Sequence, residues 1–302
     1  MAPRPSTARP ATENRNPRTV DIDTVPTSET LRMLLDEEVV AVEAARAAVP
    51  DLTRLVEYAA ECLRRGGHVH YAGAGASGRL ATLDATETTP TFGVDPDLFQ
   101  AHFPGGAAAL VDSAIDLEDA RQQGRLDLNG VTERDLVVGI TASGQTPYVD
   151  GALSAARETG AVTALITSNP DAPLHTLADV LVVADTGAEA LTGSTRLKAG
   201  TAAKVMLNAF STALMIASGR TYSNLMVGLK ATNEKLRQRS VDLLTEATGE
   251  PSARCERMLR DCEGDVSVAL VRILAGCSLP DGRDALRRTG NVRAAVQQLA
   301  RP

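Results

Sequence analysis

The chain has 302 residues, of which 43% are hydrophobic and 23% charged, a mixture typical of a folded, water-soluble protein of about two domains. Its 31 Lys and Arg against 38 Asp and Glu give a net charge of −7, which argues against nucleic acid or an anionic membrane as the main partner. With 3% aromatic residues and no Trp, stacking platforms for bases are also disfavoured.

The first part of the chain predicts a tail followed by two helices. Residues 1–20 are rich in Pro, Arg and Thr and lack the apolar stretch of a signal peptide, which predicts a flexible tail. Apolar residues recur at helical spacing over 28–49, and a second helix is predicted for 51–65. The four cysteines form no metal-binding or disulfide pattern, which favours a reducing, cytoplasmic location. The most apolar stretch, 205–219, is too short to span a membrane.

Short apolar segments alternate with helical patterns through the middle of the chain. Several of the apolar segments contain almost no polar residue, as expected when both faces of a parallel sheet are covered. We therefore expect a doubly wound α/β fold. The predicted strands are 68–72, 98–103, 135–140, 161–167 and 180–184, and the predicted helices between them are 77–85, 107–122 and 147–159.

The last third of the chain is predicted to be helical. Two long helices are followed by four short ones separated by glycine-containing turns. The sequence thus divides into the tail 1–20, an α/β domain over 21–248 and a small helical bundle over 249–302. The predicted helices are 195–218, 224–247, 252–262, 266–274, 281–289 and 292–300.

Two of the predicted strands end in similar loops. The first loop runs from Gly73 to Arg79 and the second from Thr141 to Pro147, and each places a hydroxyl residue beside a glycine. Ligands of open parallel sheets lie beyond the carboxyl ends of the strands, where backbone amides and hydroxyls can bind an anion. A nucleotide site is disfavoured, because neither a GxxxxGK[ST] motif nor the acidic residue expected after a dinucleotide loop is evident. The two loops therefore predict a site for a phosphate monoester of a small metabolite.

Other polar residues leave their roles open at this point. The segment 192–201 opens a predicted helix with hydroxyls and two cations, which somewhat favours a bound anion. Glu118 fits a solvated helix face, and Glu87 fits a polar turn. His68 and His70 point to one face of a strand, but two ligands make a poor metal site, so no metal is expected.

Five motifs taken together resemble those of N-acetylmuramic acid 6-phosphate etherases, which have the sugar isomerase (SIS) fold. The resemblance runs from about Thr12 to the C-terminal bundle; the glucokinase regulatory protein and sugar-phosphate isomerases are more distant relatives of the same fold. The motifs are Gly73-Ala-Gly-Ala-Ser-Gly-Arg79, Leu83-Asp-Ala-Thr-Glu-Thr-Thr-Pro-Thr-Phe-Gly93, Ala142-Ser-Gly-Gln-Thr-Pro-Tyr148, Leu191-Thr-Gly-Ser-Thr-Arg-Leu-Lys-Ala-Gly-Thr201 and Ala231-Thr-Asn-Glu-Lys-Leu236.

The resemblance implies a cytoplasmic homodimer with a flavodoxin-like SIS domain, a UBA-like C-terminal bundle, and no metal or organic cofactor. It implies cleavage of the D-lactyl ether of N-acetylmuramic acid 6-phosphate, which gives N-acetylglucosamine 6-phosphate and D-lactate during the recycling of peptidoglycan. The partner is thus a sugar 6-phosphate, with no nucleic acid and no membrane.

The resemblance also assigns site residues. It makes Glu118 the base that removes the C2 proton and Glu87 the acid that protonates the departing lactyl oxygen. The 6-phosphate would hold the reacting carbons in place. The expected substrate and phosphate ligands are Gly75, Ser77, Gly78, Ser143, Gly144, Thr146, Ser194 and Lys198.

The chain departs from the family pattern near the site without losing either glutamate. Two other functions stay open, a non-catalytic sugar-phosphate sensor with the same pocket and a sugar-phosphate isomerase. Retention of both glutamates favours the lyase, and an isomerase needs no acid aimed at a C3 substituent. The departures are Thr86, Thr88 and Thr89 around the first glutamate, Gln145 in place of Arg, and Ile115 and Gly228 in place of acidic residues.

Overall fold

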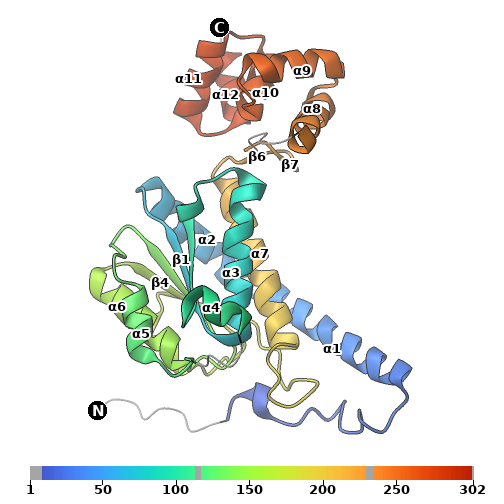
Figure 1. The fold of residues 1–302 in the computed structure, drawn as a ribbon, viewed down its shortest axis with the longest axis vertical. Helices are drawn as coiled ribbons and strands as arrows, with labels where there is room; N and C mark the ends of the chain where they lie inside the picture. The colour runs from blue at the N-terminus through green and yellow to red at the C-terminus, as the bar shows by residue number, and fades with distance from the viewer. Residues whose placement is uncertain (1–8, 113–116, 229–233, 301–302) are drawn as a thin grey trace. The chain divides into compact units, whose positions relative to one another are not determined.

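The computed structural model describes residues 9–112, 117–228 and 234–300, and the chain divides into two compact units. The first unit comprises Met1–Thr86 and Asp97–Ser211, and the second comprises Glu87–Pro96 and Thr212–Pro302. Two long helices, α3 (Gly75–Phe92) and α7 (Lys198–Ala217), contribute residues to both units (Figure 1).

The first unit is built around a five-stranded parallel sheet, which confirms the predicted fold class. Its strand order is β2-β1-β3-β4-β5, so the chain leaves β1 for one neighbour and then returns to its other side for β3. The carboxyl ends of β1 and β3 therefore flank the switch point at which such sheets bind ligands. The strands are β1 (Val69–Gly73), β2 (Phe99–His102), β3 (Leu136–Ile140), β4 (Val162–Thr167) and β5 (Val180–Val183).

Helices cover both faces of this sheet. Tyr148, Val149 and Leu153 of α6 pack against Val137 and Leu165 in one buried cluster. Figure 1 shows α5 and α6 on that side and α2, α3 and α7 on the other. The remaining elements of this unit are α1 (Thr27–Ala47), α2 (Val49–Arg64), α4 (Gly106–Val111), α5 (Arg121–Asp127), α6 (Pro147–Thr159) and the 3-10 helices Ala11–Glu13, Pro96–Leu98 and Pro173–Leu177.

The predicted helix 107–122 is wrong, because the chain forms two short helices, α4 and α5, with residues 117–120 in a non-helical segment between them. A tertiary hydrogen bond explains the break: the Tyr148 amide at the start of α6 donates to the Glu118 carbonyl at 3.0 Å. Apolar periodicity cannot reveal a contact between segments so far apart in the chain.

Helices α5 and α6 pack backbone to backbone. A Cβ atom on Gly151 of α6 would lie 1.9 Å from the Arg121 carbonyl oxygen, and one on Gly124 of α5 would lie 2.0 Å from the Tyr148 carbonyl oxygen. Both positions therefore require glycine. Because α5 begins three residues after Glu118, this crossing also sets the position of that carboxylate.

Residues 9–20 are packed rather than free, which corrects part of the expected tail. Asn16 is 3% exposed and donates to the Glu37 carboxylate at 2.8 Å. The Thr19 hydroxyl donates to the Ala190 carbonyl at 2.8 Å. These buried polar contacts fix the segment against α1, and a count of Pro and Arg in the sequence gives no sign of them.

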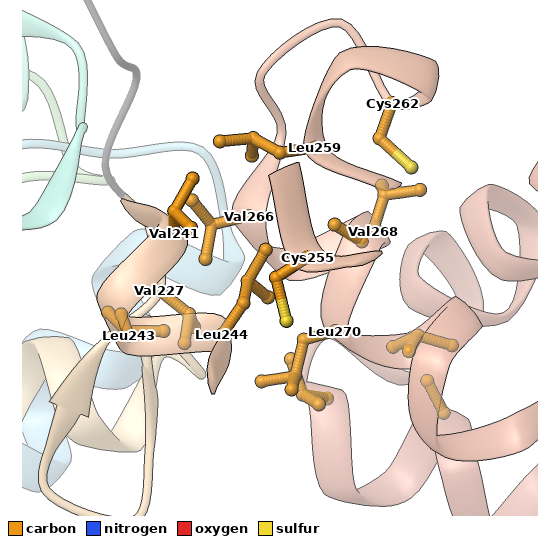
Figure 2. Packing of buried hydrophobic residues seen from close by; sticks show 14 of the residues in the cluster. Val227, Val241, Leu243, Leu244, Cys255, Leu259, Cys262, Val266, Val268 and Leu270 are labelled. Atoms are coloured by element: carbon orange, nitrogen blue, oxygen red, sulfur yellow. The ribbon is translucent and has the colours of Figure 1, made fainter. Parts of the chain in front are cut away.

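The second unit is a helical bundle with its own hydrophobic core. Cys255, Leu259, Val266 and Leu270 are buried together with Leu244, as Figure 2 shows. The predicted helix 224–247 is wrong at its start, because residues 221–226 form a hairpin in which Ser223 has a φ of 55°. The elements are β6 (Thr221–Tyr222), β7 (Leu225–Met226), α8 (Glu234–Thr248), α9 (Ser252–Asp261), α10 (Val266–Ala275), α11 (Leu279–Thr289) and α12 (Val292–Leu299).

Helix α7 is long and apolar enough, by length and composition, to cross a membrane. However, 56% of its most apolar window is buried inside the protein, as in a core helix. The Phe210 ring, for example, lies 6.4 Å from the Tyr71 ring of β1, measured between centroids.

Candidate functional site

The first loop joins β1 to α3 within two residues. A Cβ atom on Gly78 would lie 2.2 Å from the Gly73 carbonyl oxygen and 2.6 Å from the Phe103 ring, so only glycine permits this approach. Gly75, at the start of α3, has a φ of 54°, in the left-handed region that favours glycine. Ser77 lies half-buried in the first turn of α3. The loop thus presents a helix N-terminus beyond the end of β1, where amides can bind an anion.

The second loop, residues 141–146, follows β3 and is held by its own hydroxyls. Gly144 has a φ of 70°, and a Cβ there would lie 2.3 Å from the Ala172 Cβ. The Asn169 side-chain amide donates to the Ser143 carbonyl at 2.8 Å, which braces the loop from the end of β4. Thr141 and Thr146 are 3% and 5% exposed, so their hydroxyls are satisfied by protein partners.

Glu118 lies between the two loops. Its Oε1 accepts a hydrogen bond from the Thr146 hydroxyl at 3.3 Å, and its Oε2 lies 3.9 Å from the position of a Cβ on Gly75. The structure therefore brings a carboxylate, two glycine turns and several hydroxyls to the switch point of the sheet. Such a site can bind an anionic group and move a proton.

Glu87 is not among the residues gathered at these loops. It lies on α3, not in the expected turn, because the helix continues through Thr88 (3% exposed) and Phe92 (6% exposed). Glu87 follows Gly75 by twelve residues along the sequence of this helix. The side chain is exposed and belongs to the second unit.

The orientation of α3 is fixed by a buried carboxyl. Asp84 accepts hydrogen bonds from the Tyr71 hydroxyl at 2.9 Å and the Ser211 hydroxyl at 3.0 Å. Burial raises the pKa of Asp84 even though both donors oppose the shift. This cluster ties α3 to β1 and α7.

Lys198 has a buried partner in this structure. Its ammonium is 0% exposed and lies 2.5 Å from the Glu37 carboxylate, which also accepts from Asn16 and Arg18. Burial alone would raise the pKa of Glu37, but the hydrogen bonds from Arg18 and Lys198 outweigh it and lower the pKa to about 2. The expected phosphate ligand Lys198 is thus held by Glu37, whereas Ser194, in the preceding turn, is half-buried.

The positions at which the sequence departs from the family pattern have different structural surroundings. Ile115 and residues 231–233 lie outside the described residues. Gly228 allows close packing, because a Cβ there would lie 2.1 Å from the Phe92 carbonyl oxygen. Gln145 is exposed in the second loop.

Two histidines meet on the neighbouring strands β1 and β2 rather than at the loops. The His70 Nδ1 and His102 Nε2 atoms are 3.1 Å apart. Burial and the neighbouring His102 lower the pKa of His70 to about 4, so this ring is neutral at pH 7. Across the described ranges 9–112, 117–228 and 234–300, no three His, Cys, Asp or Glu side chains are arranged to hold a metal ion.

Thr141 is not among the site residues expected from the sequence, although the predicted second loop begins there. Its hydroxyl contacts Ser143 and Thr146 and accepts from the Gly144 amide at 3.2 Å. One feature of the sequence could have indicated Thr141 as a site residue. It is the first polar residue after an apolar strand, and ligands of parallel sheets bind at that position.

Several known proteins are similar to this chain in sequence or in fold. Residues 51–157 match the glucokinase regulatory protein N-terminal SIS domain, and residues 116–213 match the SIS domain. A phosphoheptose isomerase from Francisella tularensis superposes with a TM-score of 0.50 at 17% identity, covering 64% of this chain and 100% of that one. This likeness concerns the fold.

Curated relatives cover nearly the whole chain. The three relatives described next are each named N-acetylmuramic acid 6-phosphate etherase. That of Thermobifida fusca (strain YX) is 50% identical over 88% of each chain. That of Halalkalibacterium halodurans is 45% identical over 95% of this chain and 98% of its own. That of Salmonella typhimurium is 43% identical over 94% and 97%.

Proposed function

The chain belongs to the N-acetylmuramic acid 6-phosphate etherase family, and we propose that it is a carbon–oxygen lyase that cleaves the D-lactyl ether of that sugar phosphate. The products are N-acetylglucosamine 6-phosphate and D-lactate, and the role is amino-sugar recycling from peptidoglycan. The identity of 50% over 88% of the chain carries the proposal. The loops and carboxylate at the switch point supply groups suited to a phosphorylated sugar.

The chemistry requires a base and an acid. Opening of the sugar ring exposes a C1 aldehyde, which acidifies the proton on C2. Glu118 removes that proton, and the enolate then expels the lactyl ether from C3. Protonation of the ether oxygen by Glu87 makes it a better leaving group, and water then adds at C3. The position of Glu118 between the loops supports its role, whereas Glu87 is assigned by the family motif alone.

The phosphate is bound by neutral donors. Ser77 and Ser143, together with the Gly75 amide at the start of α3, are the proposed ligands, whereas the Thr146 hydroxyl donates to Glu118. They lie on the two turns that end β1 and β3. Holding the phosphate there fixes C2 and C3 relative to Glu118 and lowers the entropic part of the barrier.

We infer that the protein is a cytoplasmic homodimer. Leu31, Leu35, Val39 and Val42 form an exposed stripe along α1, with Leu35 66% exposed. Their spacing of four, four and three residues is that of a helix–helix seam, and a second copy presents the same stripe for a two-fold contact. All four cysteines are free, which suits a reducing compartment.

Solvent-exchange NMR separates the roles of the two glutamates. Glu118→Gln is expected to lose both lactate release and exchange of the C2 proton of the product with deuterated water. Glu87→Gln is expected to lose lactate release but to keep exchange, because proton removal precedes departure of lactate. Each loss should reach about 10²–10⁴-fold.

Circular dichroism is the check that both variants fold. Lactate release by Glu118→Gln at the wild-type rate would refute the base assignment. Exchange lost in Glu87→Gln but kept in Glu118→Gln would reverse the two roles. A wild-type protein that binds the sugar phosphate without releasing lactate would be a sensor instead.

A further inference from the structure

A continuous chain of hydroxyls connects the second loop to the Glu118 carboxylate. The Thr146 hydroxyl lies 3.3 Å from Glu118 Oε1, and the Thr141 hydroxyl lies 2.8 Å from that of Thr146. Ser143 Oγ lies 3.3 Å from Thr141 Oγ1 at the other end of the chain. Thr141 and Thr146 are buried, so bulk water cannot replace a lost hydroxyl at either position.

The number of protons on each hydroxyl determines which group donates and which accepts in this series of hydrogen bonds. A hydroxyl donates one hydrogen bond and accepts two, whereas an ionised carboxylate only accepts. The single proton of Thr146 is donated to Glu118, so the proton between the two threonines belongs to Thr141. Thr141 then has only its acceptor positions left, and these serve the Gly144 amide at 3.2 Å and the Ser143 hydroxyl.

We propose that Thr141 is a positioning residue for the ether cleavage, because its hydroxyl proton orients the Thr146 hydroxyl that holds Glu118 for removal of the C2 proton. Donation by Thr141 also polarises the Thr146 hydroxyl and strengthens its hydrogen bond to Glu118. The proposal deepens the proposed function and rests on it.

The same proton count separates two tasks within one loop. A substrate phosphate that takes the proton of Ser143 leaves the donation from Thr141 through Thr146 to Glu118 unchanged. Loss of the Ser143 hydroxyl should therefore act on substrate binding, and loss of the Thr141 hydroxyl on the proton-transfer step. A purely structural role for Thr141 predicts no such division between neighbouring hydroxyls.

The test compares Thr141→Val with Thr167→Val in the purified full-length protein. Thr167 is 2% exposed, and its hydroxyl braces the same loop by donating to the Ala142 carbonyl at 3.2 Å, away from the chain that leads to Glu118. Thr141→Val should lower kcat for lactate release about 10- to 100-fold, the cost of a small misplacement of a catalytic group. Thr167→Val should keep kcat within about three-fold, and Thr141→Ser should restore most of the lost activity.

Two further measurements test Thr141. The first asks whether its hydroxyl binds the phosphate, and the second asks whether it acts through Thr146. Affinity for N-acetylglucosamine 6-phosphate, measured by calorimetry, should fall in Ser143→Ala and change little in Thr141→Val. The kcat of the double variant Thr141→Val/Thr146→Val should be scarcely lower than that of Thr146→Val alone, because both substitutions interrupt the same series of hydrogen bonds to Glu118. If Thr141→Val does not fold, Thr141→Cys, with a weak thiol donor of similar size, carries the same comparisons.

Several outcomes would overturn the proposal. They are a kcat unchanged in the Thr141 variant, an equal loss in Thr167→Val, additive effects in the double variant, or a loss of product affinity that matches the loss of kcat. In each of these cases wild-type lactate release still supports the proposed function. Absence of lactate release from the wild-type protein would overturn both.

Discussion

The buried carboxylate of Glu37 shows how one residue can depend on partners from distant parts of the chain. Asn16, Arg18 and Lys198 all donate to it, and its side chain is 3% exposed. Removing one partner of a buried ion pair leaves the other charge without compensation, and this is more costly than removing both. The sequence pattern around Lys198 suggests an anion ligand, because its buried partner Glu37 lies 161 residues earlier in the chain.

The lowered pKa of Glu37 predicts an acid-sensitive contribution to stability. The folded-state pKa of about 2 lies below the ordinary value of 4.5, so the unfolded chain binds more protons between these values. The contribution is present above about pH 4.5 and is lost as the pH falls toward 2; at about 1.4 kcal/mol per pKa unit it is about 3 kcal/mol.

Glu37→Gln should therefore lower the free energy of unfolding by about 3–5 kcal/mol at pH 7, because Lys198 stays buried without a counter-charge. Urea denaturation at several pH values measures this difference, which should shrink as the pH falls from 4.5 toward 2. Glu43→Gln, on the same helix in an exposed pair with Arg46, is the control and should change little. An equal effect of the two substitutions would contradict the prediction.

A second prediction for a single residue concerns the Ser143 hydroxyl and the binding of sugar phosphates. Ser143→Ala should weaken binding of sugar 6-phosphates by about 1.5–3 kcal/mol, the value of a hydrogen bond to a charged group. Calorimetric titration with N-acetylglucosamine 6-phosphate measures the change. Ser154→Ala, on α6 with its hydroxyl on Asp150, is a matched control. Equal turnover of phosphorylated and unphosphorylated N-acetylmuramic acid by the wild-type protein would refute the phosphate site itself.

At the scale of elements, the crossing of α5 and α6 links packing to the site. Gly151→Ala would place a methyl group 1.9 Å from the Arg121 carbonyl oxygen, so α5 must move. Because α5 begins only three residues after Glu118, we expect kcat to fall at least about ten-fold, together with a loss of about 1–3 kcal/mol in stability.

Steady-state kinetics and thermal unfolding check this prediction, with Gly282→Ala as the control. Gly282 also lies within a helix, but a Cβ there meets mainly the flexible Arg272 side chain, at 3.2 Å. Its replacement should leave kcat unchanged. A Gly151→Ala variant with wild-type kinetics would show that the crossing does not position Glu118.

The strands and loops could be predicted from the sequence because their signals are local. Apolar runs marked all five strands of the sheet, and Ser-Gly turns marked both loops that meet Glu118. Elements fixed by distant contacts could not be predicted: the break at Glu118 depends on Tyr148, and the helical conformation of Glu87 overrides threonines and Pro90 that disfavour a helix. Thr141 was missed because a threonine after a strand is also an ordinary packing residue.

At the scale of the whole molecule, the exposed stripe on α1 predicts how two copies associate. Leu35→Glu should place a charge at the centre of the seam and shift the homodimer toward the 31.7 kDa monomer. Sedimentation velocity over a range of concentrations measures this shift. Leu126→Glu, at a residue 58% exposed on α5, should leave the dimer intact. A wild-type protein that is a fully active monomer at assay concentrations would refute the homodimer.

The packing of residues 9–20 sets a limit on how far the chain can be shortened. Asn16 and Arg18 supply three of the four described hydrogen bonds to Glu37, and these residues come before the first long helix. A truncated form that starts at residue 21 would open more often and be cut faster by proteases, which act on the transiently open chain. The folding unit thus begins well ahead of the first helix that a sequence-based domain boundary would retain.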